Sequence, residues 1–215
     1  MAADGTHDGS SKTPGQLRAG VERLSHGLAQ LSATRANARA GLVADSAAAV
    51  LLLAAGFQLM TDRRLAATAL VAGLLLFSFV EYAFHRWLFH GRIAAAEAGH
   101  RQHHADPVGD DALPFFLPPL AMLALAAALQ WVTDRSDAFV FAGALASGYA
   151  AYGVAHTAIH RLRFRWPLLV RWAALHHIHH HHPLRNFGVT TPLWDFVLGT
   201  RYARACADGH PRVRK

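Results

Sequence analysis

The stretch LAATALVAGLLLFSFVEYAFHRWLFH, residues 65–90, decides the fold of this chain. Its first part, Leu65–Phe84, carries a single charge, Glu81, and at roughly 1.5 Å per helical residue it nearly spans a bilayer core of about 30 Å. Three further segments have a similar length and composition, and their only charge is Asp45: Gly41–Met60, Ala112–Val132 and Ala138–Ala155. The sequence therefore predicts an all-α integral membrane protein with four transmembrane helices.

The overall composition supports this prediction. Charged residues make up 16% of the 215 residues, whereas about 25% is usual in soluble domains. The net charge of +7 does not indicate a nucleic-acid-binding protein, because the arginines flank apolar segments and no basic helix carries interleaved polar side chains. Cys206 is the only cysteine, so no disulfide within the chain is expected.

Two short connections pair the four segments into two hairpins. Thr61–Arg64 joins the first pair and Thr133–Asp137 joins the second, so both connections must lie on the same side of the membrane. That side holds three of the 21 basic residues, Arg63, Arg64 and Arg135. Because basic residues accumulate on the cytoplasmic side, both termini and the loop 85–111 are predicted to be cytoplasmic.

Three regions are expected along the chain. Residues 1–40 comprise a disordered polar segment and, over 15–40, an amphipathic helix whose leucines recur every three or four residues. This helix can lie on the membrane surface or pack on the core, and the pattern favours neither. Residues 41–200 form the four-span membrane domain, and 201–215 form a basic tail. No cleavable signal peptide is expected.

Histidines are concentrated in one part of the sequence. Thirteen of the sixteen lie between His85 and His182, all on the side predicted to be cytoplasmic, and they form four clusters: EYAFHRWLFH, HRQHH, HTAIH and LHHIHHHHP. Residues at i, i+3 and i+4 share a helix face, so HRQHH presents three imidazoles to one side and HTAIH presents two. One metal ion rarely takes more than four or five imidazoles, so about ten converging histidines predict two metal ions.

His85 and His90 do not fit this pattern. On an ideal α-helix two residues five apart lie roughly 140° apart. Either the helix ends between them or each serves a different ion.

The four clusters, read with their flanking residues, resemble the fatty acid hydroxylase/sterol desaturase superfamily over about residues 78–200. The flanks HRQHHADPVGDDALPFFLPP and GYAAYGVAHTAIH are most similar to the fatty acid 2-hydroxylases, although Gly153 stands where that branch has an aspartate. The resemblance implies a cytoplasmic histidine cluster that holds two iron ions, with zinc possible in a purified form, and dioxygen as co-substrate. It implies no catalytic side chain beyond the metal ligands.

The implied metal ligands depend on the register of the last cluster. By analogy with the 2-hydroxylases, the distance from His160 favours His177, His180 and His181, whereas the distance to Asn186 favours an alternative that includes His176 and His179. The full set in the favoured register is His85, His90, His100, His103, His104, His156, His160, His177, His180 and His181. Glu81 and Asp195 can each hold an N–H of a ligand imidazole or form an ordinary ion pair.

These features favour dioxygen-dependent oxidation of a membrane lipid chain, most of all fatty acyl hydroxylation. A sterol or carotenoid substrate, and desaturation in place of hydroxylation, stay open, as does the oligomeric state. With no haem or flavin motif visible, the electron donor is expected to be a separate protein. A metal transporter or metal-buffering protein is the alternative of another class, although the middles of the spans lack His, Asp and Glu. A metalloprotease is disfavoured because H-E-x-x-H is absent.

Overall fold

The computed structural model describes residues 14–91, 94–109 and 112–203, and within these ranges the regular elements are all helical. The segments predicted as disordered and as basic tail lie largely outside the described residues. The elements are α1 (Pro14–Ser32), α2 (Arg35–Leu59), α3 (Arg63–Ala83), the π-helix η1 (Phe84–Phe89), α4 (Ala94–Ala105), α5 (Leu117–Thr133), α6 (Asp137–Arg161), α7 (Pro167–His181) and α8 (Leu193–Val197).

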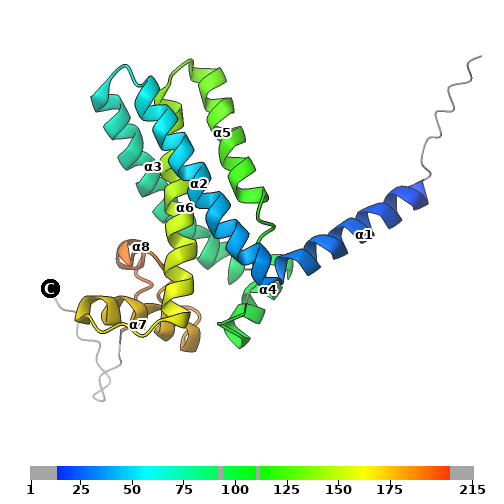
Figure 1. The fold of residues 1–215 in the computed structure, drawn as a ribbon. Coiled ribbons are helices and arrows are strands. Elements are labelled where there is room, and N and C mark those ends of the chain that lie inside the picture. Colours follow the sequence, from blue (N-terminus) through cyan, green and yellow to red (C-terminus); the bar gives the residue numbers. More distant parts are fainter. Residues whose placement is uncertain (1–13, 92–93, 110–111, 204–215) are drawn as a thin grey trace, which may run out of the picture.

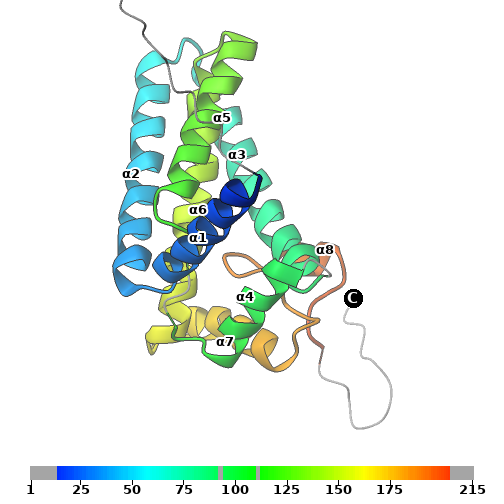
Figure 2. The same cartoon turned by 90° about the vertical axis from the view of Figure 1, so that its right-hand side faces the viewer.

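Helix α6 is the centre of the molecule and packs against α2, α3 and α5 (Figures 1 and 2). Small residues allow the close approach. A Cβ at Gly143 would meet the Leu53 nitrogen at 2.9 Å, and one at Gly73 would meet the Phe141 carbonyl at 2.7 Å. The α2–α3 and α5–α6 connections lie at one end, here called the connection end, and α4, α7 and α8 lie at the other, the histidine end (Figure 1).

Three helices are long and apolar enough to cross a membrane: Arg35–Leu59, the continuous Arg63–Phe89, and Asp137–Arg161. The fourth apolar helix, α5, has 17 residues. It begins at Leu117, five residues later than the start of the predicted span at Ala112. Pro114 precedes it, Pro118 and Pro119 occupy its first turn, and proline lacks the N–H that an earlier turn would need.

The predicted helix over 15–40 is two helices. α1 ends at Ser32, and Thr34 begins α2 because its side chain accepts a hydrogen bond from the Asn37 backbone N–H at 3.1 Å. Asn37 is itself buried and joins α2 to the irregular segment before α5, donating to the Leu113 carbonyl at 2.9 Å and accepting from the Phe115 N–H at 2.9 Å. Helix α2 therefore begins at Arg35, six residues before Gly41, where the first span was predicted to start.

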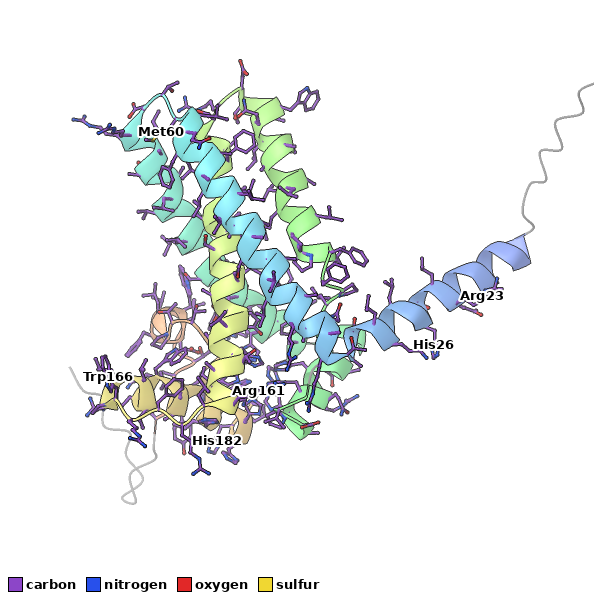
Figure 3. All side chains as sticks on the ribbon, in the orientation of Figure 1. Arg23, His26, Met60, Arg161, Trp166 and His182 are labelled. Carbon is purple, nitrogen blue, oxygen red and sulfur yellow. The ribbon has the colours of Figure 1, made fainter. Side chains whose placement is uncertain are left out.

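Helix α1 extends away from the bundle, and Arg23 and His26 project from it (Figures 1 and 3). Leu24 is 66% exposed, and the contact of α1 with the rest of the chain is at its carboxyl end. This arrangement favours an interfacial helix over a core partner, and the membrane location of α1 stays a prediction.

Candidate metal centre

Nine imidazoles converge into two adjacent groups at the histidine end. In each group, every histidine offers one ring nitrogen, and these nitrogens all lie within 4.8 Å of one another. The five-histidine group contains His85, His90, His100, His104 and His179. The four-histidine group contains His103, His160, His176 and His180. The two groups touch, since the rings of His104 and His180 stack at 4.4 Å between centroids.

A π-helix brings His85 and His90 into the same group. The His90 N–H bonds to the His85 carbonyl at 3.1 Å, which is the i→i+5 pattern of the π-helix, so residues five apart share a face. The helix therefore does not end between the two histidines, and the structure brings both into one group of imidazoles. Gly91 follows directly, and a Cβ there would overlap the Trp87 carbonyl oxygen, so this tight helix end accommodates only glycine without rearrangement.

Helix α4 supplies histidines to both groups. His100 and His104, four residues apart, face the five-histidine group, whereas His103 faces the four-histidine group and lies 4.4 Å from His156 between ring centroids. The sequence HRQHH was predicted to present three imidazoles to one side of one helix. The structure keeps that side but divides it between two groups, because consecutive positions on an α-helix diverge by about 100°.

Helix α6 contributes His160 directly and His156 at the margin. The His156 ring lies 4.9 Å from those of His160 and His176, but its nitrogens fall outside the mutual 4.8 Å of the four-histidine group. Tyr152 stacks on His156 at 5.5 Å with an interplanar angle of 13°. His156 thus faces the cluster and is held by a tyrosine that sequence reasoning did not single out.

Helix α7 brings the histidines of the alternative register together. Ala173, His176 and His179 share the buried face of α7, and His180 borders it, so His176, His179 and His180 enter the groups. His177 and His181 are exposed and belong to neither group. The register that was favoured from the sequence is therefore not the one that the structure brings together. Counting residues from His160 could not show which side of α7 is buried. That side is the one that carries Ala173, His176 and His179.

Backbone carbonyls of the loop after α7 orient two imidazoles of the five-histidine group. His85 Nδ1 lies 2.5 Å from the Phe187 carbonyl oxygen, and His179 Nδ1 lies 2.8 Å from that of Arg185. A carbonyl oxygen only accepts, so both Nδ1 atoms carry the hydrogen. In a neutral imidazole, Nε2 of each ring then presents a bare lone pair to the group.

Glu81 and Asp195 hold this loop and contact no imidazole. Glu81 accepts the backbone N–H groups of Val189 at 2.6 Å and Thr190 at 2.9 Å, together with the Thr190 hydroxyl. Asp195 accepts the N–H groups of Phe187 at 2.9 Å and Gly188 at 2.8 Å, and the Thr200 hydroxyl at 2.7 Å. Among the described residues both carboxylates thus bind backbone N–H groups of the loop, in place of the expected imidazole or ion-pair partner.

Asn186 shapes the same loop and was noted in the sequence only as a marker of register. Its φ of 54° lies in the left-handed region, which asparagine tolerates better than most residues. Its side chain donates to the Leu175 carbonyl at 3.1 Å and accepts from the Tyr202 N–H at 2.8 Å. The run Asn-Phe-Gly after the histidines is the signal that could have identified this turn.

The donor set fits metal ions better than it fits hydrogen bonding alone. Within the five-histidine group, His100 Nε2 lies 2.9–3.1 Å from Nε2 of His85, His90 and His104, and His90 Nε2 lies 3.0 Å from that of His179. These nitrogens have too few hydrogens to satisfy one another. Two nitrogens bound at right angles about 2.1 Å from a metal ion lie about 3.0 Å apart, which is the separation found.

The four-histidine group shows the same convergence with fewer supports. His176 Nε2 lies 3.0 Å from His160 Nε2 and 3.1 Å from His180 Nε2. The buried His103 Nε2 and the Nδ1 atoms of His176 and His180 have no hydrogen-bond partner among the described residues. A buried nitrogen without a partner, such as His103 Nε2, is costly in a metal-free core and would gain a partner from a bound cation.

Burial keeps these imidazoles neutral. Desolvation, reinforced by repulsion between neighbouring rings, lowers the pKa of His90 and of His103 to about 4 and that of His100 and of His180 to about 2. Desolvation also lowers the pKa of His179 to about 3 and holds the pKa of His176 well below its ordinary value. A neutral imidazole is the form that binds metal ions.

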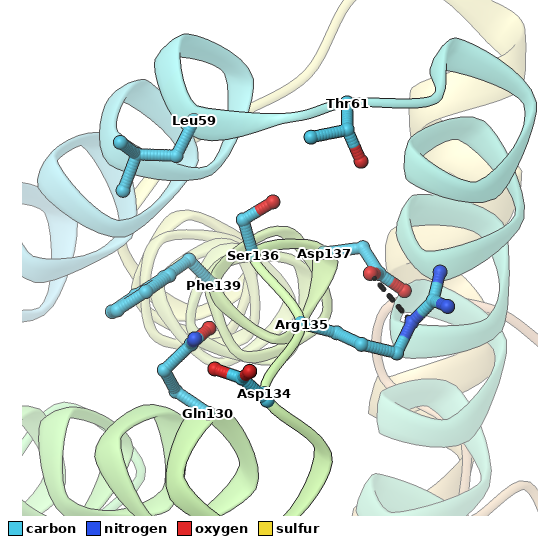
Figure 4. Close-up of a pocket in the computed structure, with 8 residues that line it drawn as sticks. All are labelled: Leu59, Thr61, Gln130, Asp134, Arg135, Ser136, Asp137 and Phe139. Atoms are coloured by element: carbon cyan, nitrogen blue, oxygen red, sulfur yellow. Dashed lines mark hydrogen bonds and ion pairs between the residues drawn. The ribbon is translucent and has the colours of Figure 1, made fainter.

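The connection end holds no such chemistry in its described residues. A cavity of about 450 Å³ there is lined by Leu59, Thr61, Gln130, Asp134, Arg135, Ser136, Asp137 and Phe139 (Figure 4). Arg135 and Asp137 form an ion pair at 3.0 Å across it. The connection end and the histidine end lie at opposite ends of the bundle (Figure 1), so this cavity is no part of the metal centre.

Comparisons with known proteins agree on one family. Mouse fatty acid 2-hydroxylase is 31% identical over 160 residues, 67% of this chain and 41% of the mouse protein. The dihydroceramide fatty acyl 2-hydroxylase FAH2 of Arabidopsis thaliana is 29% identical over 140 residues, 60% of this chain and 58% of the plant protein. This chain thus spans about half the length of these relatives.

A solved structure shares the fold. The hydroxylase domain visible in full-length scs7p superposes with a TM-score of 0.61 at 23% identity, covering 72% of this chain and 62% of the other. The model of the fatty acid hydroxylase family matches residues 70–200, a range that contains every histidine of both groups. This chain therefore belongs to the fatty acid hydroxylase family.

Proposed function

We propose that this protein uses two metal ions and dioxygen to hydroxylate a fatty acyl chain of a membrane lipid, and that the ions are iron. The observation that carries this proposal is the pair of touching imidazole groups at one end of an apolar helical bundle. Two groups of this kind place two ions side by side, and the bundle keeps the centre next to lipid.

Each group would hold one ion. In the five-histidine group the ligands are the Nε2 atoms of His85, His90, His100, His104 and His179. His103, His160, His176 and His180 would hold the second ion, with His156 beside them as a further candidate ligand. Imidazole ligands suit zinc as well as iron, so zinc can occupy the sites in a purified form.

Metal ions held by these histidines would supply the redox chemistry needed to oxidise an unactivated C–H bond with dioxygen. The residues of the chain fix where this happens. The loop that follows α7 sets the tautomers of His85 and His179, and Glu81 and Asp195 hold that loop.

The substrate class follows from the relatives and from the location. The relatives named above are a fatty acid 2-hydroxylase and a dihydroceramide fatty acyl 2-hydroxylase. Burying about fifteen methylenes at roughly 0.8 kcal/mol each holds an acyl chain in the bilayer with about 12 kcal/mol, so the enzyme must meet its substrate there. We infer an acyl lipid; a sterol or carotenoid is the second candidate.

We further infer four spans, with the histidine end and both termini in the cytoplasm. α5 is about 26 Å long at 1.5 Å per residue, a little short of the bilayer core, and the segment 112–116, which is tied to Asn37, precedes it. In this arrangement residues 41–200 are the membrane domain, and electrons arrive at the cytoplasmic face from a separate donor protein.

The test compares lipids from cells that express the wild-type chain, His103→Ala or His156→Ala, grown under ¹⁸O-labelled dioxygen. We expect labelled hydroxy fatty acids from wild type and none from either variant, with equal amounts of protein in the membrane because insertion depends on the apolar helices. His26→Ala is the control, since His26 lies on α1, outside both imidazole groups, and its ring hydrogen-bonds to Gln30 of the same helix. Identical lipid profiles together with metal transport would favour the transporter alternative.

Topology is tested separately with reporter fusions. Fusions at Arg64 and Arg135 should report the external side and a fusion at Lys215 the cytoplasm. An external Lys215 would overturn the proposed orientation.

A further inference from the structure

Two histidines that the metal centre does not use share the outer side of α7. His177 and His181 are exposed and lie in the last turns of the helix. We call them the outer pair. They are four residues apart, so they lie about 40° apart around the helix and one turn apart along it. Two histidines at this spacing on one helix face form a recognised bidentate metal site.

The outer pair adjoins the four-histidine group. The ring of His177 lies 5.9 Å from that of His160, which belongs to the group. His160 is only partly buried, whereas His176 is fully buried behind it. A cation held by His177 would therefore stand next to the accessible edge of the inner site.

Open space lies beside the second member of the pair. A cavity of about 480 Å³ is lined by Ile178, His181, His182 and Tyr202. His182 is occupied by stacking on Tyr202 at 4.4 Å between centroids, so His181 is the histidine whose ring can turn toward an ion. This volume is large enough for a cation that keeps several of its water molecules.

We propose that His177 and His181 form a third, outer binding site for a divalent transition-metal ion and pass that ion to the four-histidine group. This inference rests on the proposed function, since it presumes that the inner groups bind metal. The ion bound outside keeps water on its remaining positions. His160 displaces the first water, and the buried histidines displace the others, so the ion keeps ligands throughout the transfer.

The chemistry of the two sites sets the direction of transfer. Two imidazoles on an exposed face release an ion more readily than four converging ones, because fewer ligands must dissociate. The inner group also has bare buried nitrogens, such as His103 Nε2, that gain a partner only when the ion arrives. The ion is thus bound more tightly at each step inward.

The experiment uses the full-length chain, purified in detergent and freed of metal with a chelator, and titrates it with cobalt(II), whose visible absorption reports its ligands. Wild type should bind three ions, two tightly and one weakly, and the His177→Ala/His181→Ala double variant should bind the two tight ones. In stopped-flow mixing at limiting cobalt, the double variant should fill the four-histidine group about tenfold more slowly.

The matched control is His26→Ala, an exposed histidine on α1 outside both imidazole groups and the outer pair, which should bind three ions at the wild-type rate. A wild type that binds only two ions, or a double variant that loads as fast as wild type, would overturn the inference. Both of those results leave two inner ions in place. Failure of the proposed function would instead appear as a wild type that binds no tight pair or oxidises no lipid.

Discussion

The two imidazole groups use the same side chain but are supported in different ways. In the five-histidine group, His85 and His179 are fixed through loop carbonyls, and the loop is fixed by Glu81 and Asp195. In the four-histidine group, the Nδ1 atoms of His176 and His180 have no partner among the described residues. We therefore expect the first site to be shaped before an ion arrives and the second to be shaped largely by the ion itself.

This difference has an energetic meaning. A ligand held in its binding tautomer loses little freedom when the metal binds, whereas an unsupported ring must be ordered at that moment. We therefore expect the five-histidine group to bind its ion more tightly and release it more slowly. The four predictions below test this contrast.

The largest effect should come from removing one ligand of each group. His100→Ala and His160→Ala should each abolish hydroxylation, because the reaction needs both ions. They should differ in metal content: His160→Ala keeps the tightly held ion, and His100→Ala keeps only the weakly held one. Metal analysis after gel filtration at low free metal distinguishes them. Equal retention by the two variants would contradict the contrast.

Asp195→Asn should weaken the five-histidine group about 10–100-fold in metal affinity and leave the other group unchanged. An asparagine can accept from one of the Phe187 and Gly188 N–H groups, but its own NH₂ then faces the other donor. The loop shifts, and the His85 tautomer is no longer imposed. Competition with a chelator measures the affinity. Asp137→Asn, at the connection end, is the control.

Chelation of wild-type protein should proceed in two phases that differ about tenfold in rate, the range expected when ligand supports are lost. The fast phase should belong to the four-histidine group. It should therefore disappear in His160→Ala, while the slow phase disappears in His100→Ala. A single phase in wild type would mean that the loop contributes nothing to ion retention.

Tyr82→Phe should have the smallest effect, a loss of about 1 kcal/mol in the free energy of unfolding. Arg86 donates to the Tyr82 oxygen at 2.7 Å, and the Tyr82 hydroxyl donates to Thr200 at 2.9 Å, while Thr200 donates to Asp195. Without the hydroxyl, Thr200 keeps its bond to Asp195, so the loop stays in place. Thermal unfolding should shift while metal affinity does not.

The membrane fold and the convergence of the clusters could be predicted because both depend on local patterns. Apolar length predicts the helices, and i, i+3, i+4 spacing predicts shared faces. The π-helix escaped prediction, since the pairing of His85 with His90 requires a departure from the α-helical period that neither residue signals.

Long-range contacts could not be predicted from the sequence for another reason. Glu81 meets Val189 and Thr190 through backbone N–H groups, which every residue except proline possesses. No side-chain pattern marks such donors in the sequence. The phase of α7 was in principle accessible, because Ala173 and the apolar Trp172 lie on the same face as His176.

The π-helix at 84–89 also makes the metal centre sensitive to the number of residues between His85 and His90. It accommodates one residue more in its turn than an α-helix would, so the centre depends on a residue count as well as on residue identity. Removing one residue between His85 and His90 would leave the two histidines four residues apart. A normal α-helical turn would then still place both on one face. Inserting a residue would instead rotate His90 by about 100° and leave its place in the five-histidine group empty.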